Sequence, residues 1–308
     1  MVRENRASID PRQLAQGNPR ARAGFIGIGR MGRAISRCAH AAGHPVAAYD
    51  VDPSALQELE GLAPTAVTAS NPAQVARESD LLAVVVNDDA QVLDSVLGPQ
   101  GVLDGARPGL VVLIHSTVSV ETVLRVAAEA EPRGVVVLDA GLSGANGEKS
   151  VGQLCVMVGG TEEAFRTAEP LLETYGDPVL HLGTLGAGMR AKLARNVTCY
   201  LSYLAIYEGL QLAERAGISR AHTDRIFDAT GIASPNLDAY REMRHDLRAV
   251  DPVADPERAA LVRLVTEMGR KDLTSAQAAA IALDGELELP GVAAAIQSMS
   301  GIFGDPVE

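Results

Sequence analysis

A lysine and an asparagine stand one helical turn apart in the segment GAGMRAKLARN, which runs from Gly186 to Asn196. Side chains at positions i and i+4 of a helix lie on one face, so Lys192 and Asn196 would point the same way. Burial in a closed cleft lowers the pKa of a lysine, and such an amine can exchange a proton with a substrate hydroxyl. Asn196 would hold the same oxygen without adding charge. Most single lysines are solvated surface residues, so the pair indicates acid–base chemistry only together with the other motifs of the chain.

A second chemical signature is a glycine turn in the segment GFIGIGRMG, where three glycines have G-x-G-x-x-G spacing between a β-rich run and a helical one. The first glycine permits a tight turn, the second lets the backbone approach a pyrophosphate, and the third lets helix and strand pack closely. The start of the next helix then faces the anion with unpaired N–H groups. We therefore expect a dinucleotide to contact Gly27, Ile28, Gly29, Arg30, Met31 and Gly32.

An acidic residue follows at the position where a dinucleotide-binding unit needs one. Asp50 ends the apolar run VAAYD, 23 residues after Gly27, and a carboxylate there can accept hydrogen bonds from an adenosine ribose. The same carboxylate repels a 2′-phosphate, and no arginine follows it in DVDP. NAD is therefore the expected cofactor, with NADP less favoured. The alternative for Asp50 is a solvated turn residue.

The elements that must position these residues can be read from the apolar runs. Most runs in the first half are continuously apolar, which is typical of parallel strands buried on both faces. The expected strands span residues 23–28, 46–50, 81–86, 110–115, 135–139 and 154–159. Helical patterns lie between them, one of which starts with Asn71 as its N-cap before Pro72.

After about residue 183 the β-rich runs stop and helical patterns follow. The sequence thus predicts an α/β fold, a Rossmann-type doubly wound and mostly parallel sheet, followed by an all-α second domain. We expect a flexible tail at 1–22, a dinucleotide-binding domain at 23–183 and a helical substrate and dimerisation domain at 184–308. The charged segment 241–265 is expected to form a loop between helices of the second domain.

Composition narrows the classes of partner. The chain has 308 residues, 47% of them hydrophobic, and a formal charge of −12, which disfavours nucleic acid and anionic membranes as partners. No apolar run is long enough to cross a bilayer, and the Arg-rich N-terminus has no signal-peptide core. A mitochondrial presequence is an alternative that Glu4 and Asp10 weaken. Three scattered cysteines have no metal-ligand spacing, so we expect a cytoplasmic protein without a metal.

Five motifs in order resemble the β-hydroxyacid dehydrogenase family, which includes 3-hydroxyisobutyrate dehydrogenase and tartronate semialdehyde reductase. They are GFIGIGRMG, STVSV at 116–120, DAGLSGANGEKSVGQLCVMVGG at 139–160, GAGMRAKLARN and KDL at 271–273. The resemblance implies an NAD(P)-dependent dehydrogenase of a small β-hydroxy acid. It implies that Lys192 is the catalytic acid or base, with Asn196 beside it. A homodimer is expected by the same analogy.

The resemblance also assigns residues around the nicotinamide and the substrate. Two of the loops follow strand ends, which is where ligands bind in open α/β sheets. Ser143 and Gly144 are expected to bind the substrate carboxylate, and Thr117 to meet the nicotinamide. The remaining cofactor contacts implied are Val86 and Asn87, beneath the nicotinamide ribose, and Lys271, which reaches back from the helical domain.

Several of these polar residues have structural alternatives. Ser116 could cap the next helix, and Asp88 and Asp89 could begin one. Asp272 could cap a helix that follows it, or pair with Lys271.

The chain also departs from the family pattern at Val120, Ala145, Asn146, Lys149 and Arg195. These departures leave three other functions open. One is an imine reductase, which usually carries another proton donor at the position of Lys192. Another is a decarboxylating dehydrogenase of a sugar-acid phosphate, which would need a longer helical domain. The third is a dinucleotide-binding scaffold or sensor without activity.

Overall fold

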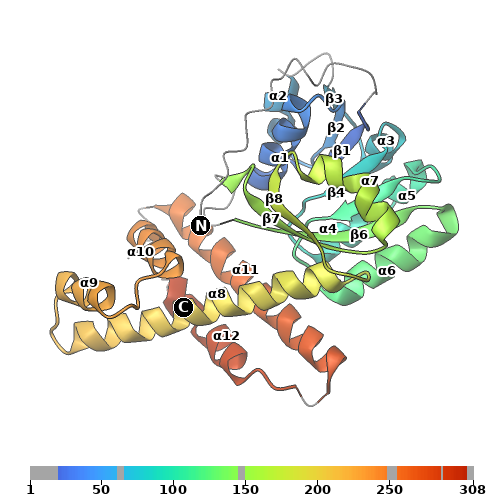
Figure 1. Cartoon of the computed structure of the whole chain (residues 1–308). Coiled ribbons are helices and arrows are strands. Elements are labelled where there is room, and N and C mark those ends of the chain that lie inside the picture. Colours follow the sequence, from blue (N-terminus) through green and yellow to red (C-terminus); the bar gives the residue numbers. More distant parts are fainter. Residues whose placement is uncertain (1–19, 61–65, 145–149, 248–254, 286, 304–308) are drawn as a thin grey trace, which may run out of the picture.

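A single eight-stranded sheet forms the centre of the first part of the chain (Figure 1). The computed structural model describes residues 20–60, 66–144, 150–247, 255–285 and 287–303. The strand order is β3-β2-β1-β4-β5-β6-β7-β8, and all neighbouring strands are parallel except β6 and β7. The strands are β1 Ala23–Ile26, β2 Val46–Tyr49, β3 Ala66–Thr68, β4 Leu81–Val84, β5 Val111–Ile114, β6 Val136–Ser143, β7 Leu154–Gly159 and β8 Gly176–His181. The predicted doubly wound α/β fold is confirmed.

Helices cover both faces of this sheet, and each face has its own apolar core. Successive strand residues alternate between the two cores: Phe25 lies in one and Ile26 in the other, and Leu81 and Leu82 divide in the same way. This double burial explains why the central strands read as continuously apolar runs. The helices are α1 Arg30–Ala41, α2 Pro53–Glu60, α3 Pro72–Arg77, α4 Asp89–Leu97, α5 Val102–Gly105, α6 Val120–Ala130 and α7 Glu162–Leu172, with a short 3₁₀ helix at Glu131–Arg133.

The second part of the described chain is helical, and one long helix joins it to the sheet (Figure 1). The N-terminal end of α8 packs on β6 and β7, where a Cβ on Gly188 would meet Met157, and the helix also packs against α10, α11 and α12. A third apolar core lies among these helices and includes Leu237, Tyr240, Val262 and Met299. The helices are α8 Ala187–Arg215, α9 Arg220–Ala229, α10 Pro235–Leu247, α11 Pro256–Leu283 and α12 Pro290–Phe303. The domain division between 183 and 184 stays a prediction.

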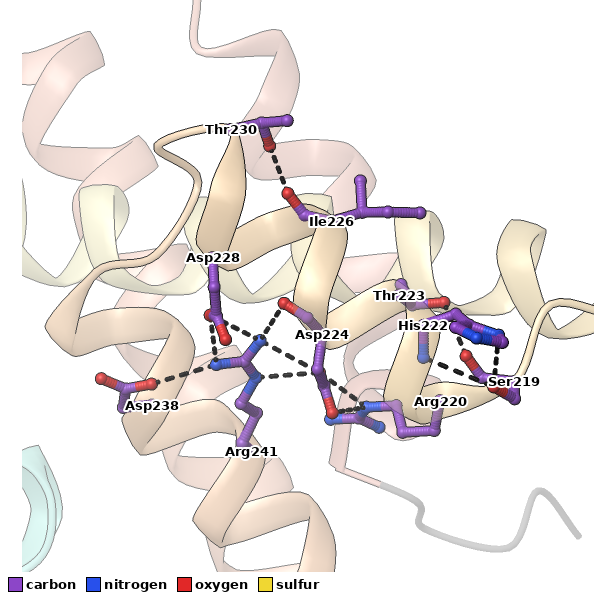
Figure 2. Close-up of polar contacts among 10 residues, drawn as sticks. All are labelled: Ser219, Arg220, His222, Thr223, Asp224, Ile226, Asp228, Thr230, Asp238 and Arg241. Atoms are coloured by element: carbon purple, nitrogen blue, oxygen red, sulfur yellow. Dashed lines mark hydrogen bonds and ion pairs between the residues drawn. The ribbon is translucent and has the colours of Figure 1, made fainter.

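An ion-pair cluster holds α9 against α10 (Figure 2). The guanidinium of Arg241 lies 3.0 Å from the Asp224 carboxylate and 3.3 Å from the carboxylates of both Asp228 and Asp238. Ser219 caps α9 by accepting a hydrogen bond from the backbone N–H of His222. The cluster fixes the outer end of the helical part, away from the sheet.

The expected loop at 241–265 is wrong over most of its length. Residues 241–247 belong to α10 and residues 256–265 to α11, while 248–254 lie outside the described residues. The helical signal of α10 is weak because few of its side chains are apolar, although Leu237 and Tyr240 are fully buried. Helix formation there follows from packing of that narrow face rather than from a strong periodic pattern.

The two strands absent from the sequence prediction are the two edges of the sheet. β3 has three residues, and β8 contains Pro178 and exposes Leu180. Edge strands have one neighbour, and proline is tolerated there because it removes no shared ladder bond. A half-solvated, interrupted strand carries little of the apolar signal that identified the central strands.

Candidate active site

The glycine turn has the geometry that its spacing predicts. Gly27 has a φ of 88°, a conformation that favours glycine, and a Cβ there would overlap the backbone of Val85. A Cβ on Gly32 would overlap the carbonyl oxygen of Gly27, whereas a Cβ on Gly29 would meet no atom within 4 Å. Helix α1 starts directly after Gly29, which has no side chain to cap it. Gly27 and Gly32 therefore serve packing, and Gly29 leaves its side of the turn open.

A cavity of about 480 Å³ lies beside this turn, at the carboxyl ends of β1, β2 and β4. It brings together five of the predicted cofactor residues: Gly27, Gly29, Asp50, Val86 and Asn87. The volume lies within the range of small-molecule sites, and the open turn with uncapped N–H groups suits a pyrophosphate. Ile28, Arg30, Met31 and Gly32 lie on the same turn and the first turn of α1.

Asp50 braces the glycine turn as well as lining the cavity. Its carboxylate accepts hydrogen bonds from the backbone N–H of Ile28 at 2.6 Å and from that of Asp52 at 2.9 Å. The side chain is half-buried at the end of β2. The wall of the cavity therefore carries a carboxylate that is held in a fixed position.

Lys192 lies where α8 crosses β6, and its Nζ donates a hydrogen bond of 2.7 Å to the carbonyl oxygen of Leu142. The helix can approach so closely because glycines face it: a Cβ on Gly141 would lie 2.8 Å from the Cβ of Lys192. Buried Asp139 anchors the helix start by accepting from the N–H groups of Gly186 at 2.7 Å and Met189 at 2.5 Å. Burial, with a smaller contribution from the Arg195 guanidinium, lowers the pKa of Lys192 to about 8.

Asn196 is buried next to Lys192 on α8, and its amide is held from both ends. Its Nδ2 donates to Asp272 Oδ2 at 2.8 Å, and its Oδ1 accepts from Arg195 Nη1 at 3.1 Å. Asp272 lies within α11, so the alternative that it caps a following helix is wrong. Burial raises the pKa of the Asp272 carboxyl. The Lys271 and Lys192 ammonium groups lower it, but by less.

Lys271 reaches from α11 to the loops that follow β4 and β5. Its Nζ donates to the carbonyl oxygens of Asn87 at 2.9 Å and Thr117 at 2.6 Å, and lies 3.5 Å from the Asp272 carboxylate. The structure thus brings together three predicted cofactor residues from distant parts of the chain. Lys271 therefore forms the ion pair with Asp272 and also contacts the loops beside the dinucleotide cavity.

The other polar residues near these loops have structural partners. Ser116 accepts a hydrogen bond from the backbone N–H of Val86 at 2.9 Å, and Ser119 rather than Ser116 caps α6. Asp88 caps α4 and Asp89 is the first residue of that helix, as expected. Asp89 also accepts hydrogen bonds from the Ser119 and Thr122 hydroxyls, which the sequence did not indicate.

Ser143 and Gly144 lie at the carboxyl end of β6 and line a second cavity, of about 320 Å³. Its other lining residues are Gln153, Cys155 and Met157 from the β7 side and Arg195 from α8. Ser143 directly follows Leu142, the acceptor for Lys192. The predicted substrate residues and the predicted catalytic amine therefore lie together. Ala145, Asn146 and Lys149 lie outside the described residues.

The described residues contain neither a metal site nor a membrane-spanning helix. Within the described ranges, no group of three or more His, Cys, Asp or Glu side chains is placed to hold a metal ion. In the same part of the chain, no helix combines the length and apolar character that a membrane span requires.

Comparison with known proteins places the chain in a family. Residues 22–184 match the model of the NAD binding domain of 6-phosphogluconate dehydrogenase. An uncharacterized oxidoreductase of Mycobacterium tuberculosis is 31% identical over 286 residues, covering 92% of this chain and 94% of that protein. The mitochondrial 3-hydroxyisobutyrate dehydrogenase of Mus musculus is 30% identical over 234 residues, covering 76% of this chain and 68% of that enzyme.

A solved structure agrees with these relatives. The 3-hydroxyisobutyrate dehydrogenase of Mycobacterium tuberculosis, determined with L-serine, superposes with a TM-score of 0.71 at 30% identity, covering 92% of this chain and 94% of that one. Together with the dinucleotide cleft, these matches identify an NAD-binding oxidoreductase that acts on hydroxyl groups. The chain belongs to the β-hydroxyacid dehydrogenase family.

Proposed function

We propose that this chain is an NAD-dependent dehydrogenase of a small β-hydroxy acid, similar to 3-hydroxyisobutyrate, in which Lys192 is the general acid and base. The observation that carries the proposal is the position of the Lys192 amine. It is held by Leu142, one residue before Ser143, on a strand of the sheet whose carboxyl edge also forms the dinucleotide cavity. A pKa of about 8 lets it work in either protonation state near neutral pH.

The residues of the chain divide the chemistry in a simple way. Bound NAD supplies the group that exchanges a hydride with the carbinol carbon. During oxidation the neutral amine of Lys192 accepts the hydroxyl proton, and during reduction its ammonium returns it. Leu142 can accept an N–H from the amine in both states, which keeps the nitrogen in place. Ser143 Oγ and the Gly144 N–H are neutral donors for the substrate carboxylate.

Asn196 and Lys271 have supporting roles in this proposal. Because Asp272 fixes the Asn196 amide, Asn196 keeps α8 and α11 in register beside Lys192. Lys271 holds the loops that carry Asn87 and Thr117, which we propose to contact the nicotinamide half of the cofactor. The glycine turn and Asp50 take the pyrophosphate and the adenosine ribose, and Val86 lines the same cleft.

The test is a screen of 3-hydroxy acids with NAD and NADP in parallel, with wild-type protein and Lys192→Ala. We expect turnover with NAD, and a loss of about two or more orders of magnitude in kcat for the variant with NAD binding retained. NAD binding without turnover on any hydroxy acid would favour the scaffold. Turnover of cyclic imines by wild type and variant alike would favour the imine reductase, against which the presence of Lys192 counts.

We also propose that the protein is a cytoplasmic homodimer assembled through its helical part. Large apolar side chains are exposed there, among them Leu212 at 73% and Ile226 at 50%. Apolar side chains that are exposed in a monomer become buried when a subunit contact covers them. Light scattering after size-exclusion chromatography tests this, and a monomer mass at micromolar concentration would contradict it.

A further inference from the structure

Arg195 carries the positive charge of the cavity next to Lys192. Among the described residues that line this cavity, it is the single charged side chain, and Ser143, Gly144, Gln153, Cys155 and Met157 complete the wall. Ser143 and Cys155 are direct partners across β6 and β7. The cavity therefore has a cation on the helix side and neutral donors on the strand side, and such a combination attracts an anion.

The guanidinium is also positioned. Arg195 Nη1 donates to Asn196 Oδ1 at 3.1 Å, and Asn196 is itself fixed by Asp272. That is the one hydrogen bond that Arg195 makes to the described residues, and the residue is exposed, so the other N–H groups of its fork can donate to water or to a ligand. An arginine fork suits a planar carboxylate because it can donate two parallel hydrogen bonds.

The order of the strands places this cavity relative to the cofactor. The dinucleotide cavity lies at the carboxyl ends of β2, β1 and β4, whereas the Arg195 cavity lies at β6 and β7. Lys192 stands over β6, the strand whose end lines the Arg195 cavity. A substrate whose carbinol carbon faces the cofactor at Lys192 would thus extend its other end toward Arg195.

The proposed reaction also needs a permanent positive charge at this place. When Lys192 acts as a base it is a neutral amine, and Ser143 and Gly144 are neutral donors as well. Among the described residues that line this cavity, Arg195 is then the one charged partner that a substrate carboxylate can have. The guanidinium of Arg195 would supply this charge in both directions of the reaction.

We propose that Arg195 binds the substrate carboxylate together with Ser143 and Gly144, which makes it the residue that selects an acid over a neutral alcohol. This inference rests on the proposed function. The ligand class is a short hydroxy acid whose carboxylate lies on the side of Lys192 away from the cofactor.

The experiment measures binding separately from turnover. Enzyme loaded with NADH is titrated calorimetrically with 3-hydroxyisobutyrate, which forms a complex that cannot react, and with the neutral amide of the same acid. We expect Arg195→Gln to weaken binding of the acid by about 10- to 100-fold and to leave the amide unchanged, because a charge-assisted hydrogen bond is lost. Arg195→Lys should recover part of the loss, and Arg215→Gln at the far end of α8 should have no effect.

The alternative is that Arg195 acts only by positioning Asn196. In that case Arg195→Gln would lower kcat for acid and amide equally and leave both dissociation constants unchanged, which would overturn the inference. Binding of the acid that depends on Arg195, but without turnover by the wild type, would overturn the proposed function and support the inference. Turnover of the acid by the wild type, with a dissociation constant that does not change in Arg195→Gln, would support the proposed function and overturn the inference.

Discussion

The protonation state of Lys192 depends on opposing effects at a single amine. Burial and the Arg195 guanidinium lower its pKa, whereas the Asp272 carboxylate raises it. Burial is the largest effect, so the result is a pKa of about 8 instead of 10.5. Without Asp272, the amine would be neutral over a wider pH range and a poorer proton donor for reduction.

The pH dependence of the two reaction directions should therefore be opposite. The oxidation rate, measured as kcat/KM, should rise as pH increases through about 8, because the neutral amine is the base. The reduction rate should fall through the same interval, because the ammonium is the acid. Steady-state kinetics between about pH 6 and about pH 10 measure both pH profiles, the rising limb for oxidation and the falling limb for reduction.

Asp272→Asn provides the control for that assignment. Removing the carboxylate removes the group that raises the pKa of Lys192, so both limbs should move to lower pH. Asp284→Asn, at the C-terminal end of the same helix, should leave them in place. If neither limb moves in Asp272→Asn, the titrating group is not Lys192.

At the scale of elements, different glycines of the turn serve stability and cofactor binding. Gly29→Ala should keep the melting temperature, since its φ of −64° suits alanine and no protein atom lies near the new Cβ. It should still weaken NAD binding by about tenfold or more, because the added methyl group occupies the open side of the turn. Gly32→Ala should lower the melting temperature, since its Cβ overlaps Gly27. Equal NAD affinity in wild type and Gly29→Ala would place the pyrophosphate elsewhere.

The contact between α8 and the sheet depends on another glycine. A Cβ on Gly188 would overlap the carbonyl oxygen of Met157 and lie 2.8 Å from that of Asp139. Gly188→Ala should therefore destabilise the protein by about 1–3 kcal/mol and displace Lys192. Gly209→Ala, in the same helix with its Cβ 3.6 Å from Phe227, should be neutral or stabilising by about 0.5–1 kcal/mol. Chemical denaturation of both variants measures this difference.

At the scale of the whole molecule, Lys271 connects the helical part to the cofactor loops. Lys271→Met should raise the Kd for NAD and reduce the increase in melting temperature that saturating NAD produces, because the loops at Asn87 and Thr117 lose their tie to α11. Arg263→Met removes a cation from the exposed face of the same helix and should change neither quantity. A thermal shift assay with increasing NAD compares them. If NAD raised the melting temperature of Lys271→Met as much as that of the wild type, the contacts of Lys271 with these loops would not contribute to NAD binding.

The parts of the site that were predictable are those with a local signal. Glycine spacing, an acid at a strand end, and a lysine and asparagine at i and i+4 are visible within a few residues. Central strands were also predictable, because burial on both faces makes them continuously apolar. The edge strands β3 and β8 and the weakly apolar helix α10 were not, because one-sided burial leaves little pattern.

By itself, the sequence determined the fold class and the place of the dinucleotide turn, and it singled out the amine that we propose as the acid and base. Only the tertiary structure decided what those groups contact: Leu142 for Lys192, Asp272 for Asn196, and Asn87 with Thr117 for Lys271. Three of these four acceptors are backbone carbonyls. Every residue has a backbone carbonyl, so residue type does not show which of them accepts the hydrogen bond. Lys271 and Asn87 are 184 positions apart, so nothing short of the folded chain brings them together.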